Sequence, residues 1–248
     1  GNPAGEKSVL VWGDSHAGVA LGAIDKVCRE LDLSGIAITR GGTPPVFGWS
    51  GWPETTWEHT NIIKSGDIVR GYLSEDSEFH PKYAVLVFRW SHYVPRREHL
   101  PQMDNIPLSG FGDALVKTIE LLQEKGVQVA VMLEPPVFQS HVPRRAAMNA
   151  WRGFPMPKLT VLEHRGFNEA YAPILKQLRS KVPEAILMDP ATYLAPDGDN
   201  VEFLDEDGVL LYRDQHHLTS RGAERLKPLF RDFLQNSAKS FPRETSDK

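Results

Sequence analysis

Five short runs of apolar residues are spaced along the chain, and amphipathic segments lie between them. The runs occupy positions 8–12, 36–38, 85–88, 127–133 and 186–188. Continuous apolar runs of this length are typical of strands that are buried on both faces of a sheet. The pattern therefore predicts five buried strands.

The segments between the runs carry apolar residues at helical spacing. One stripe consists of Ala20, Ile24, Val27 and Leu31, and shorter stripes follow at 115–122 and 226–233. Each stripe is typical of a helix that packs one face against a core. Because strands that alternate with helices form βαβ units, we predict an α/β fold. It is a three-layer sandwich, with helices on both faces of a five-stranded, mostly parallel, doubly wound sheet.

These elements fit one domain that runs from about 7 to 237. The opening residues, 1–6, are interpreted as a linker or a cloning remnant, and the polar end, 238–248, as a tail. Polar chain ends commonly fray unless other elements hold them.

Three long loops follow the second, third and fourth predicted strands, at about 40–56, 90–108 and 134–160. Doubly wound sheets bind ligands outside the carboxyl ends of their strands. Long loops in a compact domain are often functional. We therefore expect the functional site at this edge of the sheet.

Composition narrows the classes of function. The chain has 28 Lys and Arg against 32 Asp and Glu, a formal net charge of −4. This balance argues against a broad nucleic-acid surface, which needs clustered basic residues. No run of 18 apolar residues occurs, so no membrane span is predicted. The single cysteine, Cys28, excludes an internal disulfide and a multi-cysteine zinc site. Oligomeric state stays open.

The first predicted strand ends in Gly13-Asp14-Ser15-His16, and a helix follows. A serine at such a turn presents its hydroxyl at the carboxyl edge of the sheet. Its backbone N–H lies at a helix N-terminus, which stabilises a developing oxyanion. Gly13 permits a tight turn, and we expect Gly18 to permit close helix packing. The alternative is that Asp14-Ser15 is a helix cap without catalytic function.

A second motif lies 202 residues further on, where Asp214 and His217 precede the last helix. In a turn, a carboxylate and an imidazole three residues apart can form a hydrogen bond. The carboxylate then orients the ring, and the ring accepts the proton of Ser15. Parallel strands bring both motifs to one edge, so we predict a Ser15–His217–Asp214 triad. His216 is interpreted as the outward-facing neighbour.

Three motifs together resemble the SGNH (GDSL-like) hydrolase superfamily, whose sheet is flavodoxin-like. They are Gly13-Asp14-Ser15-His16, Arg89-Trp90-Ser91 and Leu211-Tyr212-Arg213-Asp214-x-x-His217-Leu218. The set is similar to one branch, the SGNH domains fused to membrane acyltransferase-3 domains of cell-surface O-acetyltransferases.

The resemblance implies roles for particular residues. Ser15 is the implied nucleophile, His217 the general base and acid, and Asp214 the orienting carboxylate. The implied oxyanion donors are the N–H of Ser15 and that of Gly41 or Gly42. The third donor of the superfamily, an asparagine, is missing, because Trp90 stands roughly in its place. Arg89, the indole of Trp90 or Ser91 would then substitute for it, and packing at the sheet edge is the alternative for Arg89 and Trp90.

Further residues are candidates for substrate contact. They are His16, Ser91, Trp49 and Trp52. The two tryptophans are suited to stacking on sugars, although packing is their alternative. His16 either lines the pocket or is exposed at the start of the helix.

The implied function is transfer of an acetyl group through Ser15 to a hydroxyl of a cell-surface glycan, such as a lipopolysaccharide O-antigen. No bound cofactor is expected; acetyl-CoA is the implied ultimate donor, through a membrane acyltransferase-3 domain. The implied location is the periplasm, tethered to the inner membrane.

Three other interpretations stay open. One is a carbohydrate acetylesterase that uses the same site, and another is a degenerate glycan-binding module. The last is a metal-dependent phosphoesterase, in which Asp14-x-His16 joins His216 or His217 as ligands. The downstream motifs of that class are not found in this sequence.

Overall fold

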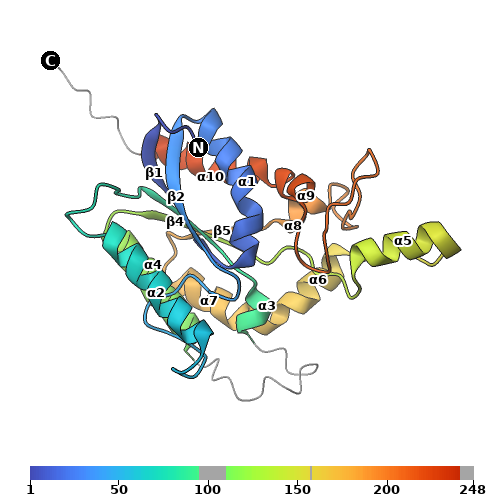
Figure 1. Ribbon diagram of the computed structural model, residues 1–248, viewed down its shortest axis with the longest axis horizontal. Helices are drawn as coiled ribbons and strands as arrows, with labels where there is room; N and C mark the ends of the chain where they lie inside the picture. The colour runs from blue at the N-terminus through green and yellow to red at the C-terminus, as the bar shows by residue number, and fades with distance from the viewer. Residues whose placement is uncertain (95–109, 157, 241–248) are drawn as a thin grey trace.

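Five parallel strands form one sheet in the order β2-β1-β3-β4-β5, with helices on both faces (Figure 1). The computed structural model describes residues 1–94, 110–156 and 158–240. The strands are β1 (Glu6–Gly13), β2 (Leu33–Thr39), β3 (Tyr83–Val87), β4 (Gln128–Met132) and β5 (Ile186–Met188). The predicted α/β class and all five predicted strands are confirmed.

Alternate residues of β1 supply the two halves of the core. Val9 and Val11 pack on one side with α1 (Ser15–Glu30) and α10 (Lys227–Ser240). Leu10 and Trp12 pack on the other side with α2 (Trp57–Tyr72), α4 (Phe111–Glu124) and α7 (Ala172–Lys181). This alternation follows from the two-residue repeat of a strand. In the described ranges, none of the helices combines the length and apolarity needed to cross a bilayer.

The prediction that every strand is buried on both faces is wrong for two of them. After buried Leu33, every position of β2 is partly buried or exposed, and Ile186 of β5 is exposed. Both strands lie at an edge of the sheet, where each pairs with a single neighbouring strand. An apolar run in this fold therefore does not by itself indicate a central strand.

The remaining elements lie in the long connections. They are α3 (Trp90–Tyr93), α5 (Val142–Arg152), α6 (Val161–Phe167), η1 (Asn168–Tyr171), α8 (Ala191–Leu194) and α9 (Ser220–Glu224). The prediction of a loop over 134–160 is wrong where α5 lies, because that helix does not direct an apolar stripe into the core. Of the predicted loop at 90–108, residues 95–108 lie outside the described residues.

The structure describes the first end of the chain from Gly1 and the last end as far as Ser240. Asn2 donates its backbone N–H to the carbonyl of Leu33, and β1 begins at Glu6. The last helix extends to Ser240, and 241–248 lie outside the described residues. The predicted boundaries at 7 and 237 stay predictions.

Gly13 and Gly18 differ sharply in the space around them. A β-carbon on Gly13 would lie 1.7 Å from the carbonyl oxygen of Val87, so only glycine allows β1 and β3 to approach here. Around Gly18, nothing lies within 4 Å of such an atom, and the residue is exposed. The expectation that Gly18 permits close helix–sheet packing is wrong; Ala17 faces the core instead.

We expect Gly13→Ala to lower the free energy of unfolding by about 3 kcal/mol or more, because the clash is with backbone. Gly18→Ala removes a flexible residue from an exposed helix position and should raise the free energy of unfolding by about 0.5–1 kcal/mol. Urea unfolding of both variants measures the difference. Equal stability of the two variants would contradict the steric role assigned to Gly13.

Candidate active site

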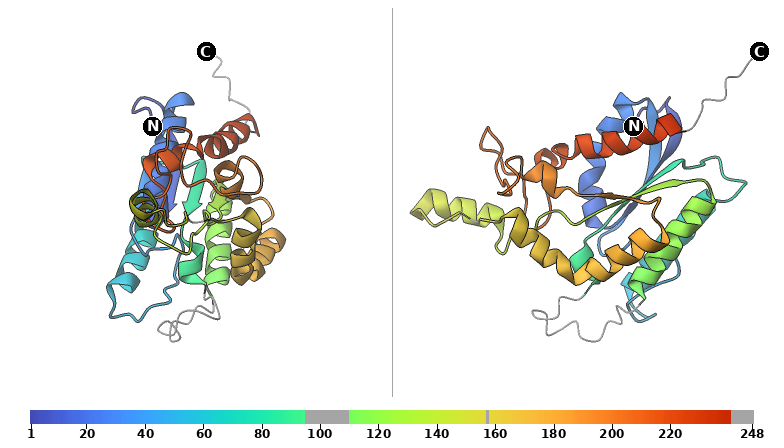
Figure 2. Two further views of the ribbon diagram at one scale, coloured as in Figure 1. Left: turned by 90° about the vertical axis from the view of Figure 1, so that its right-hand side faces the viewer. Right: turned by 180° about the vertical axis from the view of Figure 1, so that it is seen from behind.

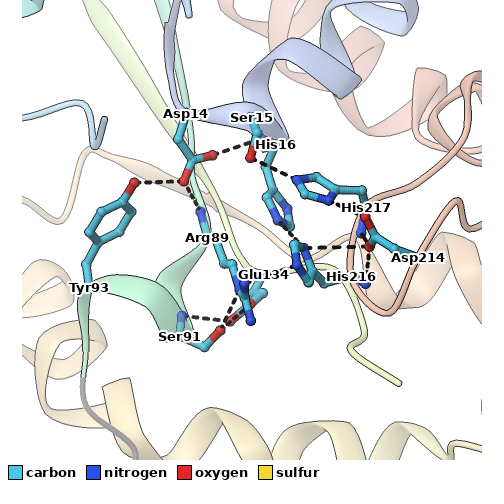
Figure 3. A network of polar contacts seen from close by, with 10 residues as sticks. All are labelled: Asp14, Ser15, His16, Arg89, Ser91, Tyr93, Glu134, Asp214, His216 and His217. Carbon is cyan, nitrogen blue, oxygen red and sulfur yellow. Dashed lines mark hydrogen bonds and ion pairs between the residues drawn. The ribbon is translucent and has the colours of Figure 1, made fainter. Parts of the chain in front are cut away.

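Two segments that are far apart in the sequence meet at the carboxyl edge of the sheet (Figure 3). The Oγ of Ser15 lies 2.8 Å from Nε2 of His217. On the other side of the ring, Nδ1 of His217 lies 2.7 Å from Oδ2 of Asp214. The structure therefore brings the three residues of the predicted triad into one row of hydrogen bonds.

The loop that precedes α9 fixes Asp214 and His217 by its own backbone. Tyr212 and Leu218 form an antiparallel bridge, and Oδ1 of Asp214 accepts the N–H groups of His216 (2.9 Å) and His217 (2.7 Å). Burial alone would raise the pKa of the Asp214 carboxyl. The hydrogen bonds from these two N–H groups and from the His217 ring lower it by more, so the pKa of Asp214 lies well below its ordinary value. Asp214 is consequently ionised when it orients His217.

Helix α1 is capped by Asp14 and not by Ser15. Oδ1 of Asp14 accepts the N–H of His16 at 2.8 Å, while Oδ2 accepts the N–H of Arg89 (2.9 Å) and the hydroxyl of Tyr93 (3.0 Å). The carboxylate thus caps the helix and also bonds across to the end of β3. The capping function that the alternative gave to Asp14-Ser15 is thus performed by Asp14, and the hydroxyl of Ser15 bonds to His217 instead. Burial raises the pKa of Asp14 to about 6.

Arg89, His216 and His16 form a hydrogen-bonded chain beside the triad. Nη1 of Arg89 lies 3.0 Å from Nε2 of His216, and Nδ1 of His216 lies 3.1 Å from Nε2 of His16. A guanidinium can only donate, so Nε2 of His216 accepts and its Nδ1 carries the proton that His16 accepts. The direction of the whole chain is therefore set by Arg89.

Both histidines of this chain favour the neutral form. Burial, followed by the charge of Arg89, lowers the pKa of His216 to about 4. Burial also lowers the pKa of His16 well below its ordinary value. The interpretation of His216 as an outward neighbour is wrong, because its ring lies between Arg89 and His16. The alternative of an exposed His16 is wrong too, since that side chain is buried.

The same cluster is a candidate set of metal ligands. One nitrogen each of His16, His216 and His217 lie within 4.8 Å of one another. Neutral imidazoles suit zinc. An ion bound through Nε2 of His217 would, however, displace the hydrogen bond to Ser15, and Arg89 would add a cation next to it. The arrangement fits proton transfer from Ser15 better than it fits metal ligation.

The residues after β3 are held by Glu134, which follows β4. The carboxylate of Glu134 accepts the N–H (2.9 Å) and hydroxyl (2.7 Å) of Ser91, and it lies 3.6 Å from Nε of Arg89. The indole of Trp90 is buried and donates to the carbonyl of Met132 at 2.9 Å. The prediction that Trp90 is an oxyanion donor is therefore wrong, because the one N–H of its side chain already donates to Met132 in the core. For Arg89 and Ser91, contact with an oxyanion or a substrate stays a prediction.

The two candidate glycines lie in a turn directly after β2. Thr39 pairs with Gly13, and Arg40 donates its N–H to the carbonyl of Gly13 at 3.1 Å. The turn therefore lies at the level of the sheet edge where α1 begins. Gly42 adopts a positive φ of 68°, which favours glycine. Which of Gly41 and Gly42 faces an oxyanion stays a prediction.

Trp49 and Trp52 pack against aromatic neighbours from α3 and from the start of α4. Trp49 lies 5.1 Å from Phe111 between ring centroids, and Trp52 lies 6.0 Å from Tyr93. Both are only partly buried. Packing accounts for the contacts observed, and their contact with a substrate stays a prediction.

A groove of about 870 Å³ opens beside Ser15, between α1 and α9. Two exposed glycines on one side of α1, Gly18 and Gly22, leave space along its floor. The rest of the lining combines apolar residues, such as Val19 and Leu218, with polar and charged ones, which include Lys26, Arg213, Thr219 and Glu224. A groove of this kind can hold a polar molecule close to the Ser15 hydroxyl.

Two residues that support the site were not predicted from the sequence. Tyr93 bonds to Asp14, and Glu134 holds Ser91. A signal for Glu134 is present, because it is a lone acid placed directly after the apolar run at 127–133. Tyr93 carries none, since a tyrosine in a loop is too common to single out.

Comparison with known proteins places the chain among relatives of similar fold. The family model for an SGNH domain (fused to AT3 domains) matches residues 1–232. Among solved structures, the lipopolysaccharide acetyltransferase periplasmic domain of Salmonella ser. Paratyphi A matches with a TM-score of 0.63 and 15% identity, over 94% of this chain and 85% of that one. A family two carbohydrate esterase from Clostridium thermocellum matches with a TM-score of 0.51 and 9% identity, over 96% and 67%. No curated protein matches the sequence significantly. At these identities the structural matches establish the fold alone.

We expect His216→Gln to flatten the dependence of stability on acid pH. The pKa of His216 is about 4 in the folded protein against an ordinary 6.5, so below pH 6.5 the unfolded chain binds a proton that the folded one does not. Between pH 6.5 and pH 4, the free energy of unfolding of the wild type should therefore fall by about 1–2 kcal/mol more than that of His216→Gln. This figure is already reduced for screening by solvent. The glutamine amide can accept from Arg89 and donate to His16 without titrating. Urea unfolding across this range measures the difference, and parallel curves would contradict the assignment.

Proposed function

Since the chain belongs to the family of SGNH domains fused to AT3 domains, we propose that it is an O-acetyltransferase domain that acts on a hydroxyl of a cell-surface glycan. The observation that carries the proposal is the row of hydrogen bonds from Ser15 through His217 to Asp214. The likeness to a lipopolysaccharide acetyltransferase domain supports an acceptor of the O-antigen class.

In the first step, Ser15 takes the acetyl group. Its Oγ attacks the acetyl carbonyl carbon while Nε2 of His217 accepts the hydroxyl proton. The bond to the leaving group then breaks, and that group departs with the proton from His217, which leaves acetyl-Ser15. Ionised Asp214 stabilises the imidazolium that forms between these events.

In the second step, a glycan hydroxyl takes the place of the leaving group. It gives its proton to Nε2 of His217 and attacks the acetyl carbon, and Ser15 recovers the proton as its ester bond breaks. The negative oxygen of both tetrahedral intermediates needs donors. The N–H of Ser15 is one, because the first N–H groups of a helix have no acceptor within it. An N–H from Gly41 or Gly42 is the proposed second.

The proposed donor pathway extends beyond this chain. An AT3 domain in the membrane would deliver an acetyl group that originates from acetyl-CoA, and this domain would work in the periplasm, tethered to the inner membrane. The fusion described for the family supports an AT3 partner. The periplasmic location of the matched Salmonella domain supports the same compartment.

The groove beside Ser15 is the proposed acceptor site. It opens at the nucleophile, and its lining of Lys26, Arg213, Thr219 and Glu224 offers both donors and acceptors to sugar hydroxyls. The glycines at 18 and 22 keep its floor open.

Ser15→Ala should reduce hydrolysis of a small activated acetyl ester by at least about 10³-fold, because the nucleophile is removed while the fold is kept. Rates with p-nitrophenyl acetate and the intact mass of quenched wild-type protein test this. A single acetyl group should be trapped on Ser15, and a chelator should leave the rate unchanged.

Two outcomes would contradict the proposal. One is full activity of Ser15→Ala, and the other is loss of wild-type activity in chelator, which favours the metal-dependent alternative. Addition of de-O-acetylated lipopolysaccharide oligosaccharide then separates transfer from hydrolysis. Acetyl groups found only in acetate would indicate the carbohydrate acetylesterase instead.

Gly18→Leu should separate acceptor binding from ester chemistry. The new side chain enters the groove one helical turn from Ser15, so transfer to the oligosaccharide should fall at least about tenfold, while hydrolysis of the small ester changes less than about twofold. The matched control is Gly71→Leu, at an exposed glycine of α2 that also has open space around it. Equal transfer by both variants would place the acceptor elsewhere.

A further inference from the structure

Helix α5 extends from the body of the molecule, and every one of its residues after Val142 is exposed or only partly buried. Figures 1 and 2 show it projecting beyond the rest of the fold. Of its residues, Val142 alone is buried. Helices of a globular domain normally bury one face, so an uncovered amphipathic helix indicates a surface that meets something else.

The projecting segment, residues 135–162, is anchored near both of its ends. At the start, Phe138 is buried, donates its N–H to the carbonyl of Gln215 at 2.9 Å and lies 4.9 Å from Tyr212 between ring centroids. At the end, the carbonyl of buried Leu159 accepts the N–H of Val201 at 2.9 Å. The first anchor contacts the loop that carries Asp214 and His217. Helix α5 is therefore held at the same edge of the sheet as the candidate active site.

Charged and apolar residues divide between two sides of α5. At 100° per residue, one side holds Val142, Pro143, Ala146, Ala147, Ala150 and Trp151, and the other holds Arg144, Arg145, Asn149 and Arg152 together with one apolar residue, Met148. The exposed fraction of Trp151 is 73%, that of Phe154 just beyond is 38%, and that of Leu162 at the second anchor is 80%. Large apolar side chains are thus exposed on the same segment that carries the arginines.

The charge of this segment is opposite to that of the chain. Residues 135–162 contain Arg144, Arg145, Arg152 and Lys158 but no Asp or Glu, whereas the whole chain has a net charge of −4. This segment therefore has a net charge of +4, while the rest of the chain has a net charge of −8. This combination attracts an anionic surface that can also accept apolar side chains.

We propose that α5 docks on a lipid bilayer that contains anionic phospholipid. The arginines bind the lipid head groups. Trp151, Phe154 and Leu162 enter the boundary between the head groups and the acyl chains, as the apolar faces of interfacial amphipathic helices do. The guanidinium of Arg152 lies 3.8 Å from the ring centre of Trp151, so charge and apolar surface are presented together. A soluble polyanion would attract the arginines but would leave Leu162 in water. The docked helix would hold the Ser15 edge of the sheet close to the membrane.

The test is flotation of the full chain with vesicles of phosphatidylcholine that contain about one third phosphatidylglycerol. We expect binding that weakens with salt and is far weaker on phosphatidylcholine alone. Each arginine near such a surface contributes about fivefold to affinity. Arg144→Gln/Arg145→Gln/Arg152→Gln should therefore reduce binding about 100-fold.

A variant of equal net charge is the control. Lys117→Gln/Lys176→Gln/Arg179→Gln removes the same charge from exposed positions on α4 and α7, and it should change binding less than about twofold. Binding that falls equally in both variants would overturn the proposal, as would no binding by the wild type at low salt. Far-ultraviolet circular dichroism checks that both variants are folded.

Tryptophan fluorescence gives a second readout. Vesicles should shift the emission of the wild type to shorter wavelength. The shift should be lost in Trp151→Phe and kept in Trp57→Phe, whose tryptophan is also exposed but lies on α2. A shift that survives Trp151→Phe would overturn docking through α5. Ser15→Ala should bind vesicles like the wild type, so this inference and the proposed function fail separately.

Discussion

The buried carboxylate of Asp14 is the contact on which the rest of the site depends. Its two oxygens accept hydrogen bonds from the first turn of α1, from the backbone after β3 and from Tyr93. An acceptor buried without donors would be costly, so these three donors must stay where they are. The position of Ser15 relative to the third strand therefore follows from the need to satisfy one side chain.

Two carboxylates of the site experience opposite environments. Asp14 is enclosed by the core, and burial dominates, so its pKa is raised to about 6. Asp214 lies in a loop whose own N–H groups surround it, and its pKa is held well below the ordinary value. The first carboxylate is therefore suited to building the turn and the second to supporting charge on His217. The two histidines that bond to each other, His216 and His16, favour the neutral form and add no charge that would compete with the imidazolium.

The sequence was informative where one geometric rule determines the outcome. Parallel strands end at a common edge, so a serine after the first strand and an Asp-x-x-His before the last helix were predicted to meet, and the structure brings them together. It was uninformative where a side chain depends on a distant partner. The indole of Trp90 is engaged by the carbonyl of Met132, and the ring of His216 is turned inward by Arg89. Helix α5 was not predicted for a different reason, because most of its apolar positions are alanines, which form only a weak apolar stripe in the sequence.

The hydrogen bond between Ser15 and His217 joins residues that are 202 positions apart. Contacts of such long range form late, after the intervening chain has lost most of its freedom. A ribosome that has released only the first strands and helices has exposed the serine without its base. The nucleophile thus gains its proton acceptor only when nearly the whole domain has been synthesised and folded, so an incomplete chain carries Ser15 in an unactivated form.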